Sequence, residues 1–394
     1  MTRSPSRIER RRRVLFVTGT RADFGKLKPL LGAVQGAPEL DCHVFATGMH
    51  TLARYGLTVH EIEKAGFGNV VTHRNQTEDG HEPMDAVLAA TVAGLGRHLR
   101  ALGPDLLVVH GDRIEALAGA TVGALNNVLT AHVEGGEISG TVDELIRHAV
   151  TKLSHLHFVA NPLAARRLVQ LGELPESVFV IGSPEVDVML SPALPPLDEV
   201  RRKYEIRFPR YLIFAYHPVT TELPGLPERI AGIVAALEES GHDFVVIYPN
   251  NDPGSGAILE ALRPLESHPR FRVLPSMRFE YFLTLLKHAR AVVGNSSSGV
   301  REAPVYGVPT IDLGSRQRNR QELASIRPVA EERGALAAAL ADLPGRFPPA
   351  LHFGGGGSGD AFLACLRRPE LWATAPQKQF RDLDSGPTWR ADAR

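Results

Sequence analysis

Short apolar runs alternate with longer amphipathic stretches along almost the whole chain, and this alternation constrains the fold more than any other feature. Runs such as VLFVT (14–18) and DLLVVH (105–110) are separated by stretches with apolar residues at helical spacing, such as residues 83–102. Runs that are apolar on both faces suit parallel strands covered by helices on both sides. The pattern therefore predicts an α/β fold built on parallel sheets.

The alternation is interrupted once, by the proline-rich segment 191–200, and then starts again. Such a segment is typical of a hinge, and 394 residues exceed the length of one ordinary domain. We therefore predict a first domain over residues 1–190, a second over residues 195–357 and a poorly ordered polar tail over residues 374–394. The other strands are predicted at 42–47, 130–134, 155–160, 177–182, 211–217, 243–249, 270–275, 289–294 and 309–314.

Composition excludes several classes of partner. The 44 basic and 44 acidic residues cancel, which argues against a nucleic-acid binder, and we interpret the arginines at 10–13 as part of a solvated tail. The apolar run that follows them is far too short for export or for crossing a membrane. Cys42 and Cys365 form no metal or redox motif, so we expect free, buried thiols in a reducing cytoplasm.

Polar and glycine-containing clusters stand at the ends of six predicted strands. In open α/β sheets, ligands bind outside the carboxyl ends of the strands. Both halves contribute clusters, so we expect one ligand site in a cleft between the two domains. The six clusters are GTRAD (19–23), HGDR (110–113), VEGGE (133–137), His217-Pro218, residues 249–252 and GNSSSG (294–299).

Two kinds of residue in these clusters suit phosphate. GNSSSGVRE reads as a helix start whose backbone N–H groups, with Ser296 and Ser297, could cradle phosphoryl oxygens; a simple helix cap fits equally well. Arg21, Arg113 and Arg316 each follow a predicted strand, where a guanidinium could bind phosphate, although each alone could form a surface ion pair. The chain has no Walker lysine and no GxGxxG after a strand, so we expect neither a nucleoside triphosphatase nor a nicotinamide cofactor.

Carboxylates are concentrated in the first half, where acid–base chemistry would need them. Asp112 and Glu134 follow apolar strands, where an unpaired charge would be costly, so a purely structural role suits them poorly. For Glu144 we favour a solvated helix face. The full group is Asp112, Glu134, Glu137, Asp143 and Glu144, with Arg147 one helical turn beyond Asp143.

The histidines divide into two groups. His132, His155 and His157 lie in or near predicted strands, and we expect them to be packed in the interior. No HxH or HExxH stands beside a carboxylate at metal-ligand spacing, so we expect no metal. His217 ends a strand at the predicted cleft, where it could touch a leaving phosphate.

Several long strings resemble the UDP-N-acetylglucosamine 2-epimerase family, most closely its hydrolysing branch. That branch includes bacterial sialic-acid enzymes and the epimerase half of the animal bifunctional epimerase/kinase. The resemblance runs in order from about Val14 to GGGGSG (354–359), and the segment HVEGGEISGTVDELIRH is its most specific part. The other strings are GTRADFGKLKPL, VVHGDRIEALAGA, YHPVTTE, PNNDPGS and GNSSSGVREAPVYGVPTIDLGSRQRNR.

The resemblance implies two Rossmann-like domains that face each other across a cleft, as in GT-B glycosyltransferases, with a C-terminal helix (about 358–373) returning to the first domain. It implies a homodimer or homotetramer that needs no cofactor. The implied catalytic carboxylates are Asp112, Glu134 and Asp143, with Arg147 and His217 lining the reaction centre. The implied ligands of the UDP-sugar are Arg21, Ala22, Arg113, Gly136, Asn250, Ser296, Ser297, Glu302 and Arg316, with Glu302 accepting from ribose hydroxyls.

The implied reaction inverts C2 of UDP-N-acetylglucosamine. UDP leaves C1 while a carboxylate removes the C2 proton, which gives a 2-acetamidoglycal. Hydrolysis of this intermediate would release N-acetylmannosamine; addition of UDP would instead interconvert the two UDP-sugars. A GT-B glycosyltransferase and a non-catalytic UDP-sugar sensor are further alternatives, which the carboxylate-rich first domain disfavours.

Two features depart from the family pattern. Gly355, in HFGGGGSGDA, stands where the family has the aspartate of a YGDG-type turn, so the local nucleotide contact there is in doubt. The HREMLD-like segment of the non-hydrolysing branch, associated with its allosteric substrate site, is also missing. ATGMHTLARYG (46–56) stands nearby.

Overall fold

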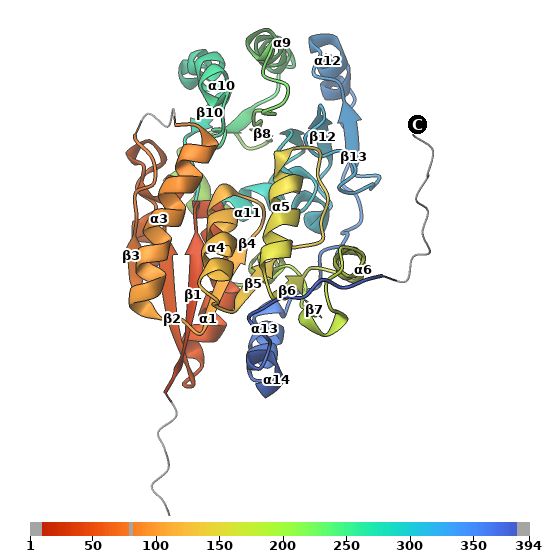
Figure 1. Ribbon diagram of the computed structural model, residues 1–394. Helices are drawn as coiled ribbons and strands as arrows, with labels where there is room; N and C mark the ends of the chain where they lie inside the picture. Colours follow the sequence, from red (N-terminus) through yellow and green to blue (C-terminus); the bar gives the residue numbers. More distant parts are fainter. Residues whose placement is uncertain (1–9, 79–81, 384–394) are drawn as a thin grey trace, which may run out of the picture.

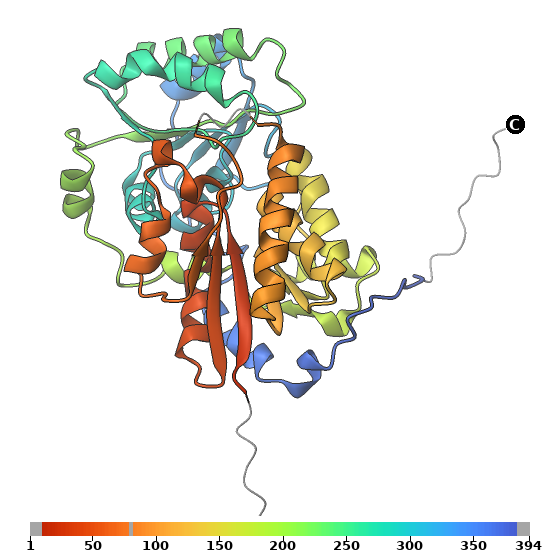
Figure 2. The same ribbon diagram turned by 60° about the vertical axis from the view of Figure 1, so that its left-hand side comes forward.

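A computed structural model describes residues 10–78 and 82–383, which form two parallel sheets with helices packed on them (Figures 1 and 2). The first sheet has the strand order β3-β2-β1-β4-β5-β6-β7, and the second has the order β10-β9-β8-β11-β12-β13. In both, the order reverses beside the first strand, which is the Rossmann arrangement. The predicted fold of two Rossmann-like α/β units is therefore confirmed.

The first unit holds seven strands and seven helices of the described chain. Its strands are β1 (Arg12–Thr18), β2 (Leu40–Ala46), β3 (Val70–Thr72), β4 (Leu106–His110), β5 (Thr130–Val133), β6 (Leu156–Val159) and β7 (Val178–Val180). Its helices are α1 (Arg21–Gly36), α2 (Val59–Lys64), α3 (Met84–Leu102), α4 (Ile114–Leu125), α5 (Val142–Leu153), α6 (Pro162–Gln170) and α7 (Pro184–Met189).

The second unit follows the proline-rich segment. Its strands are β8 (Leu212–Ala215), β9 (Phe244–Ile247), β10 (Phe271–Leu274), β11 (Val292–Gly294), β12 (Thr310–Leu313) and β13 (Ile326–Val329). Its helices are α8 (Leu197–Lys203), α9 (Leu226–Glu239), α10 (Ser255–Leu262), α11 (Phe279–His288) and α12 (Arg333–Ala341). Two helices, α13 (Ser358–Leu366) and α14 (Pro369–Trp372), come after it.

Successive residues of the central strands point to opposite faces, and both faces are buried. In β1, Val14 and Phe16 pack into the cluster on the α1 side of the sheet, whereas Leu15 and Val17 pack into the cluster with α3, α4 and α5. Two buried faces explain why these strands are continuously apolar in sequence.

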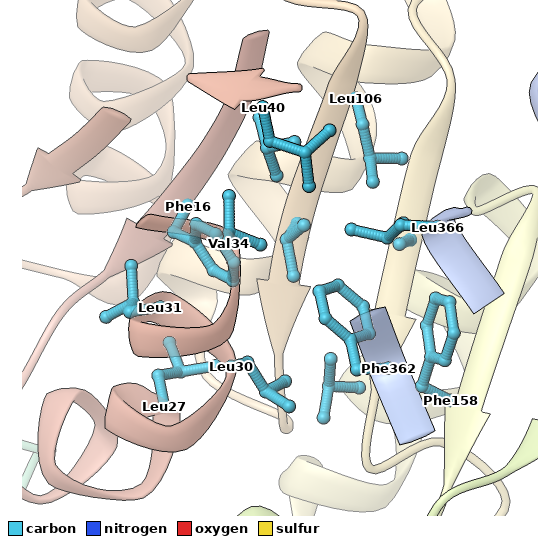
Figure 3. Close-up of a cluster of buried hydrophobic side chains, with 14 of the residues drawn as sticks. Phe16, Leu27, Leu30, Leu31, Val34, Leu40, Leu106, Phe158, Phe362 and Leu366 are labelled. Atoms are coloured by element: carbon cyan, nitrogen blue, oxygen red, sulfur yellow. The ribbon is translucent and has the colours of Figure 1, made fainter. Parts of the chain in front are cut away.

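Helix α13 lies against the first sheet rather than the second (Figures 1 and 3). Phe362 is completely buried, with its ring centroid 4.7 Å from that of Phe158 and 6.4 Å from that of Phe16. The chain thus passes between the two units twice, so that two covalent connections restrict their relative position.

The structure corrects the sequence reading at the first strand. Arg12 and Arg13 belong to β1 and not to a solvated tail. The Arg13 backbone N–H donates to Oδ2 of Asp105 at 2.8 Å, and the Arg12 guanidinium lies 4.2 Å from the Trp372 ring centroid. The Arg13 guanidinium also donates to the Leu102 carbonyl at 2.6 Å, so a backbone acceptor and an aromatic ring accommodate the two charged side chains at this end of the strand.

Strands β3 and β13 were not predicted. Both lie at a sheet edge and are short, and Val71 in β3 is 39% exposed, so they lack the continuously apolar pattern of the central strands. The histidine prediction is confirmed: His132, His155 and His157 are all buried.

The predicted disordered tail falls partly outside the described residues, which end at residue 383. Residues 374–383 have no regular secondary structure but contact the first unit. There the Lys378 Nζ donates to the Ser154 carbonyl at 2.7 Å and pairs with Glu173. Both cysteines are free; Cys365 is buried as predicted, whereas Cys42 is only partly buried. No helix among the described residues has the length and apolarity needed to cross a membrane.

Candidate active site

A cavity of about 300 Å³ lies between the carboxyl ends of the two sheets. Side chains from all six predicted strand-end clusters line it, together with residues that follow β10 and β12. Twelve of the fourteen residues proposed for the site from sequence are among the lining residues: Arg21, Ala22, Asp112, Arg113, Glu134, Asp143, His217, Asn250, Ser296, Ser297, Glu302 and Arg316.

Arg147 and Gly136 do not line the cavity. The Arg147 side chain is fully buried behind Asp112 and donates to the Glu137 carbonyl and the Ser139 hydroxyl, both at 3.3 Å. Gly136 has a φ of +76°, and a Cβ there would lie 2.3 Å from the Ala164 carbonyl oxygen. In this structure Arg147 holds Asp112, and Gly136 allows a close approach of two backbone segments.

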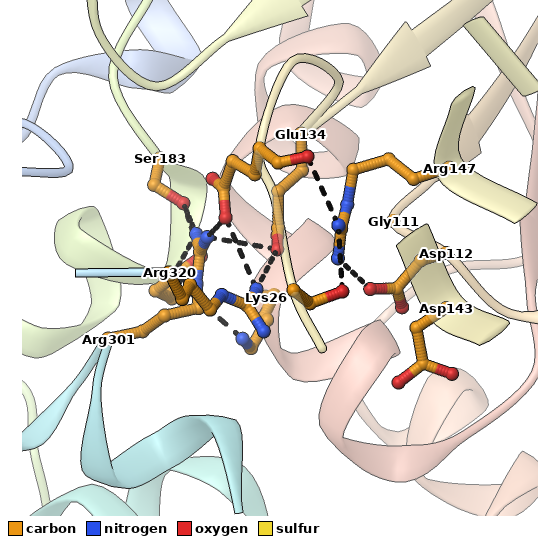
Figure 4. A network of polar contacts seen from close by, with 12 residues as sticks. Lys26, Gly111, Asp112, Glu134, Asp143, Arg147, Ser183, Arg301 and Arg320 are labelled. Carbon is orange, nitrogen blue, oxygen red and sulfur yellow. Dashed lines mark hydrogen bonds and ion pairs between the residues drawn. The ribbon is translucent and has the colours of Figure 1, made fainter. Parts of the chain in front are cut away.

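Asp112 and Asp143 are brought into one site by two helix starts (Figure 4). Asp112 stands between β4 and α4, and Asp143 lies in the first turn of α5, whose N-cap Thr141 accepts from the Asp143 N–H. Arg147, one turn further along α5, pairs with Oδ2 of Asp112, whereas Oδ2 of Asp143 lies 3.0 Å from Arg316 of the second unit.

These two carboxyl groups have pKa values shifted in opposite directions. Burial opposes ionisation of Asp112, but the charges of Arg147 and Arg320 outweigh it and lower its pKa. Burial raises the pKa of Asp143; Arg316 opposes that rise and the negative charge of Asp112 adds to it. Acid–base catalysis on one substrate needs such a separation of proton affinities.

Glu134 is the third carboxylate of the site, and it occupies a strained position. Its φ of +73° is unusual for a residue other than glycine, and such strain is concentrated at functional sites. Its Oε1 lies 3.0 Å from Arg301 and 3.4 Å from Arg320. Burial would raise the Glu134 pKa, but Arg301, Lys26 and His110 together hold it well below its usual range.

A buried ionic network joins the two units beneath Glu134 (Figure 4). The Arg301 guanidinium, from the second unit, also pairs with Glu137 and lies 2.6 Å from Glu185. Lys26 of α1 lies 2.9 Å from Oε1 of Glu302. Buried charges are tolerated when they are paired in this way, and removing one partner from such a network is strongly destabilising.

The segment predicted to bind phosphate differs locally from the prediction. GNSSSGVRE does not start an α-helix: Ser297–Gly299 and Ala303–Tyr306 form two short 3-10 helices, which Pro304 and glycines keep short. At the preceding Gly294, a Cβ would lie 2.0 Å from the Ala215 carbonyl oxygen, so only glycine lets the end of β11 approach β8 so closely. Ser296 and Ser297 nevertheless line the cavity.

His217 is fixed by its neighbours on both sides. Its backbone N–H donates to Oδ1 of Asn295 at 2.7 Å, and its ring Nδ1 accepts from the Asn250 N–H at 3.1 Å. Burial, together with the charge of Arg316, lowers the His217 pKa to about 3. The ring is therefore neutral with its proton on Nε2, which makes it a hydrogen-bond donor beside the cavity.

Glu144 is not a solvated residue of the helix face. Its Oε2 accepts from the Ser139 N–H at 2.7 Å, so it satisfies a backbone donor just before the start of α5. Within VEGGEISGTVDE, Glu134 and Asp143 therefore line the cavity, whereas Glu144 holds the loop between them.

Several ionisable residues of the site were not selected from the sequence: Asp23, Lys26, His110, Glu115 and Arg320, which line the cavity, and Arg301, which contacts Glu134. Asp23 and His110 stood within the quoted clusters GTRAD and HGDR, so their position was available as a signal. Arg301 and Arg320 also stood within the quoted strings GNSSSGVRE and GNSSSGVREAPVYGVPTIDLGSRQRNR, but nothing in the sequence shows that they reach Glu134 from the other unit. Among the described residues, no group of three or more His, Cys, Asp or Glu side chains could hold a metal ion.

Comparisons with known proteins agree on one family. Residues 32–359 match the family model described as UDP-N-acetylglucosamine 2-epimerase. A protein of Neisseria meningitidis serogroup B with the name UDP-N-acetylglucosamine 2-epimerase is 47% identical over 378 residues, which cover 95% of this chain and all of the relative. UDP-N,N'-diacetylbacillosamine 2-epimerase (hydrolyzing) of Legionella pneumophila is 31% identical, over 79% of this chain and 83% of that protein.

A solved structure shows the same fold. It is the UDP-GlcNAc 2-epimerase of Methanocaldococcus jannaschii in complex with UDP-GlcNAc and UDP, which superimposes with a TM-score of 0.76 over 90% of this chain and 99% of the other. The two chains are 20% identical, so this likeness concerns the fold alone.

Proposed function

The chain belongs to the UDP-N-acetylglucosamine 2-epimerase family, and on that premise we propose that it converts UDP-N-acetylglucosamine to N-acetylmannosamine and UDP. The observation that carries the proposal is the cavity, in which carboxyl groups of opposite pKa shift face a serine- and arginine-lined segment. The carboxyl groups suit proton transfer at a sugar carbon, and the serines and arginines suit a departing diphosphate.

The nucleotide would lie against the second unit. Phe282, Met277 and Pro275 line an apolar part of the cavity that suits a flat base. Oε2 of Glu302 is buried without a hydrogen-bond partner in the described structure, so it is available to accept from ribose hydroxyls. Ser296 and Ser297 would donate to the diphosphate.

Cations from both units would neutralise the leaving group. Arg21, Arg113 and Arg316 line the cavity, and each reaches across to the opposite unit, where it contacts Ser276, Asn251 and Asp143 respectively. The neutral His217 would donate from Nε2 to a phosphate oxygen, which stabilises the negative charge that develops as the C1–O bond breaks.

The reaction would proceed in two halves. An ionised carboxylate, for which Asp112 is suited by its lowered pKa, takes the C2 proton while the C1–O bond breaks and UDP leaves with the bonding electrons. The product is a 2-acetamidoglycal. Water then adds its hydroxyl to C1, and C2 is protonated on the opposite face by an acid, for which Asp143 is suited by its raised pKa. The sugar released has the manno configuration.

The hydrolytic outcome is the finer part of the proposal. It is supported by the segments GDRIEALAG and VEGGEISGTVDE, which resemble those of hydrolysing enzymes, and by the relative whose name includes "hydrolyzing". Both outcomes share the glycal, and a barrier difference of about 1.4 kcal/mol between water attack and UDP return shifts the partitioning tenfold.

Phosphorus NMR of the protein with UDP-N-acetylglucosamine tests this outcome. We expect the diphosphate signals of the UDP-sugar to be replaced by those of free UDP, with N-acetylmannosamine in the same sample. A stable mixture of UDP-N-acetylglucosamine and UDP-N-acetylmannosamine without free UDP would contradict hydrolysis and would leave the 2-epimerase in place.

Two accompanying proposals concern assembly and location. We expect a homodimer or homotetramer that works in a reducing cytoplasm. Leu125 and Leu145 are more than 70% exposed on α4 and α5, and a contact between subunits over these two helices would remove them from water. The two free cysteines suit a reducing compartment.

A further inference from the structure

Asp23, His110 and Glu134 form a continuous chain of contacts at the carboxyl edge of the first sheet. Nδ1 of His110 lies 2.7 Å from Oδ1 of Asp23, and Nε2 lies 2.9 Å from Oε2 of Glu134. His110 is the last residue of β4, Asp23 lies in the first turn of α1, and Glu134 follows β5. All three line the cavity, and the His110 side chain is 6% exposed.

Both ends of this chain are held in place. The second oxygen of Asp23 accepts from the Thr18 hydroxyl at 2.6 Å and from the Gly19 N–H at 3.1 Å. The other oxygen of Glu134 lies against Arg301 and Arg320. The His110 ring therefore stands between two fixed carboxylates, one on each ring nitrogen.

His110 makes one hydrogen bond, through Nδ1 to Asp23, whereas the contact of Nε2 with Oε2 of Glu134 is an ion pair rather than a hydrogen bond. A neutral ring would stand uncharged between two carboxylates, whereas the imidazolium attracts both. Burial alone would lower the His110 pKa, but the contacts with Asp23 and Glu134 raise it to about 10.

The other ionisable groups near Asp23, His110 and Glu134 do not take over the role of Asp23. His132, on β5, is neutral because burial lowers its pKa to about 3, and burial lowers the pKa of His50, near Asp23, to about 4. Arg301 and Arg320 contact Oε1 of Glu134, the oxygen that does not face His110, and Lys26 acts on Glu134 through its charge. Asp23 and Glu134 are thus the two groups that favour the charged ring.

We propose that Asp23 is a positioning residue for the epimerase reaction, which acts through His110 to hold Glu134 in place and ionised. The inference rests on the proposed function. Asp23 keeps a second proton on His110; the charged ring then gives Oε2 of Glu134 a charge-assisted contact opposite the two arginines. Without the charge of Asp23, His110 loses a proton at lower pH, and Glu134 loses one of the three cations that contact it.

Nitrogen-15 NMR of the full-length protein, labelled at histidine, tests the charge of His110 directly. His110→Asn assigns the resonance by its disappearance. At pH 8 we expect wild-type His110 to be doubly protonated and His110 in Asp23→Asn to be neutral. A neutral ring in the wild type, or a ring that stays doubly protonated in Asp23→Asn, would overturn the proposal.

Turnover tests the consequence. His110 in the wild type keeps its charge until the pH rises through about 10, so it adds no loss of kcat between pH 6.5 and 9. In Asp23→Asn we expect kcat at pH 8 to fall roughly 10- to 10³-fold, with KM within about threefold, and a new loss of kcat as pH rises within this range. An unchanged kcat profile would also overturn the proposal.

Thr18→Val is the matched control. It removes the other side-chain contact of Asp23 but leaves its charge and its contact with His110. We expect it to keep the wild-type His110 resonance and the shape of the wild-type pH profile; loss of the His110 proton in this variant would count against Asp23. The nitrogen signals do not depend on turnover, so a wild-type protein that left UDP-N-acetylglucosamine unchanged would contradict the proposed function separately.

Discussion

The carboxyl groups of the cavity are paired with cations, but the cations lie in different places. Arg147 is fully buried and holds Asp112 from behind, whereas Arg316 reaches Asp143 from the other unit. Glu134 has cationic partners on both oxygens. Proton transfer is therefore expected to depend on Asp112, Glu134 and Asp143, while nucleotide binding depends on the serines and the arginines that line the opposite part of the cavity.

Substitutions should separate these two tasks. Asp112→Asn and Glu134→Gln keep the shape of each side chain but remove its charge, so we expect kcat to fall roughly 10²- to 10⁴-fold with UDP affinity nearly unchanged. Ser297→Ala and Arg113→Ala should instead weaken UDP binding. Steady-state kinetics and calorimetric titration with UDP measure the two effects. Near-normal turnover in Asp112→Asn would contradict the role given to it.

The sequence predicted which strand ends carry side chains that line the cavity, but not how those side chains pair. Asp112, Glu134 and His217 could be selected because each follows an apolar strand. The contact of His110 with Asp23 depends on the order of strands β1, β4 and β5, which the sequence does not contain. The contact of Arg301 with Glu134 depends on how the two units pack against each other, and that packing is set by tertiary contacts that the sequence does not show.

Helix α5 carries Asp143 and Arg147, and its two ends are stabilised by different parts of the chain. Thr141 caps its start, and Glu144 binds the preceding loop. At its end, Lys378 donates to the carbonyls of Thr151 and Ser154. A cation at this end also complements the helix dipole. The C-terminal segment thus contributes to the stability of a helix that belongs to the site.

Lys378→Met tests this contribution. The substitution keeps the length of the side chain but removes its hydrogen-bond donors, and it leaves the buried Glu173 with fewer partners. We therefore expect the free energy of unfolding to fall by about 1–3 kcal/mol and the melting temperature to fall by roughly 2–6 °C. Lys152→Met is the matched control, because Lys152 also contacts Glu173 but is half exposed. Equal melting temperatures for the two variants in thermal unfolding would contradict the role of the segment.

Periodicity located the central elements well and the peripheral ones poorly. Eleven predicted strands overlap observed strands, because burial on both faces demands continuous apolar runs. Strands β3 and β13 pair with a neighbouring strand on one side only and are partly exposed, so their sequences need not be continuously apolar. The segment after Gly294 looked like a helix start because serines are frequent N-caps, but Pro304 and the glycines allow only short 3-10 turns.

For the molecule as a whole, the cavity exists because two Rossmann-like sheets direct their carboxyl ends toward each other. The contacts that close it join the two units: Arg21 with Ser276, Arg113 with Asn251, Arg316 with Asp143 and Arg301 with Glu137. The groups proposed to transfer protons come from the first unit, and the segment proposed to bind phosphate comes from the second. The proposed chemistry therefore requires both units in this arrangement.

Exchange of the C2 proton tests the central claim most directly. The protein is incubated with UDP-N-acetylglucosamine in D₂O, and the amino sugar is isolated and examined by proton NMR and mass spectrometry. A carboxylate that removes the C2 proton and an acid that restores it from solvent place one deuterium at C2 of a product with the manno configuration. A manno product that keeps its original hydrogen at C2 would contradict the mechanism, and an unchanged UDP-N-acetylglucosamine would contradict the proposed function itself.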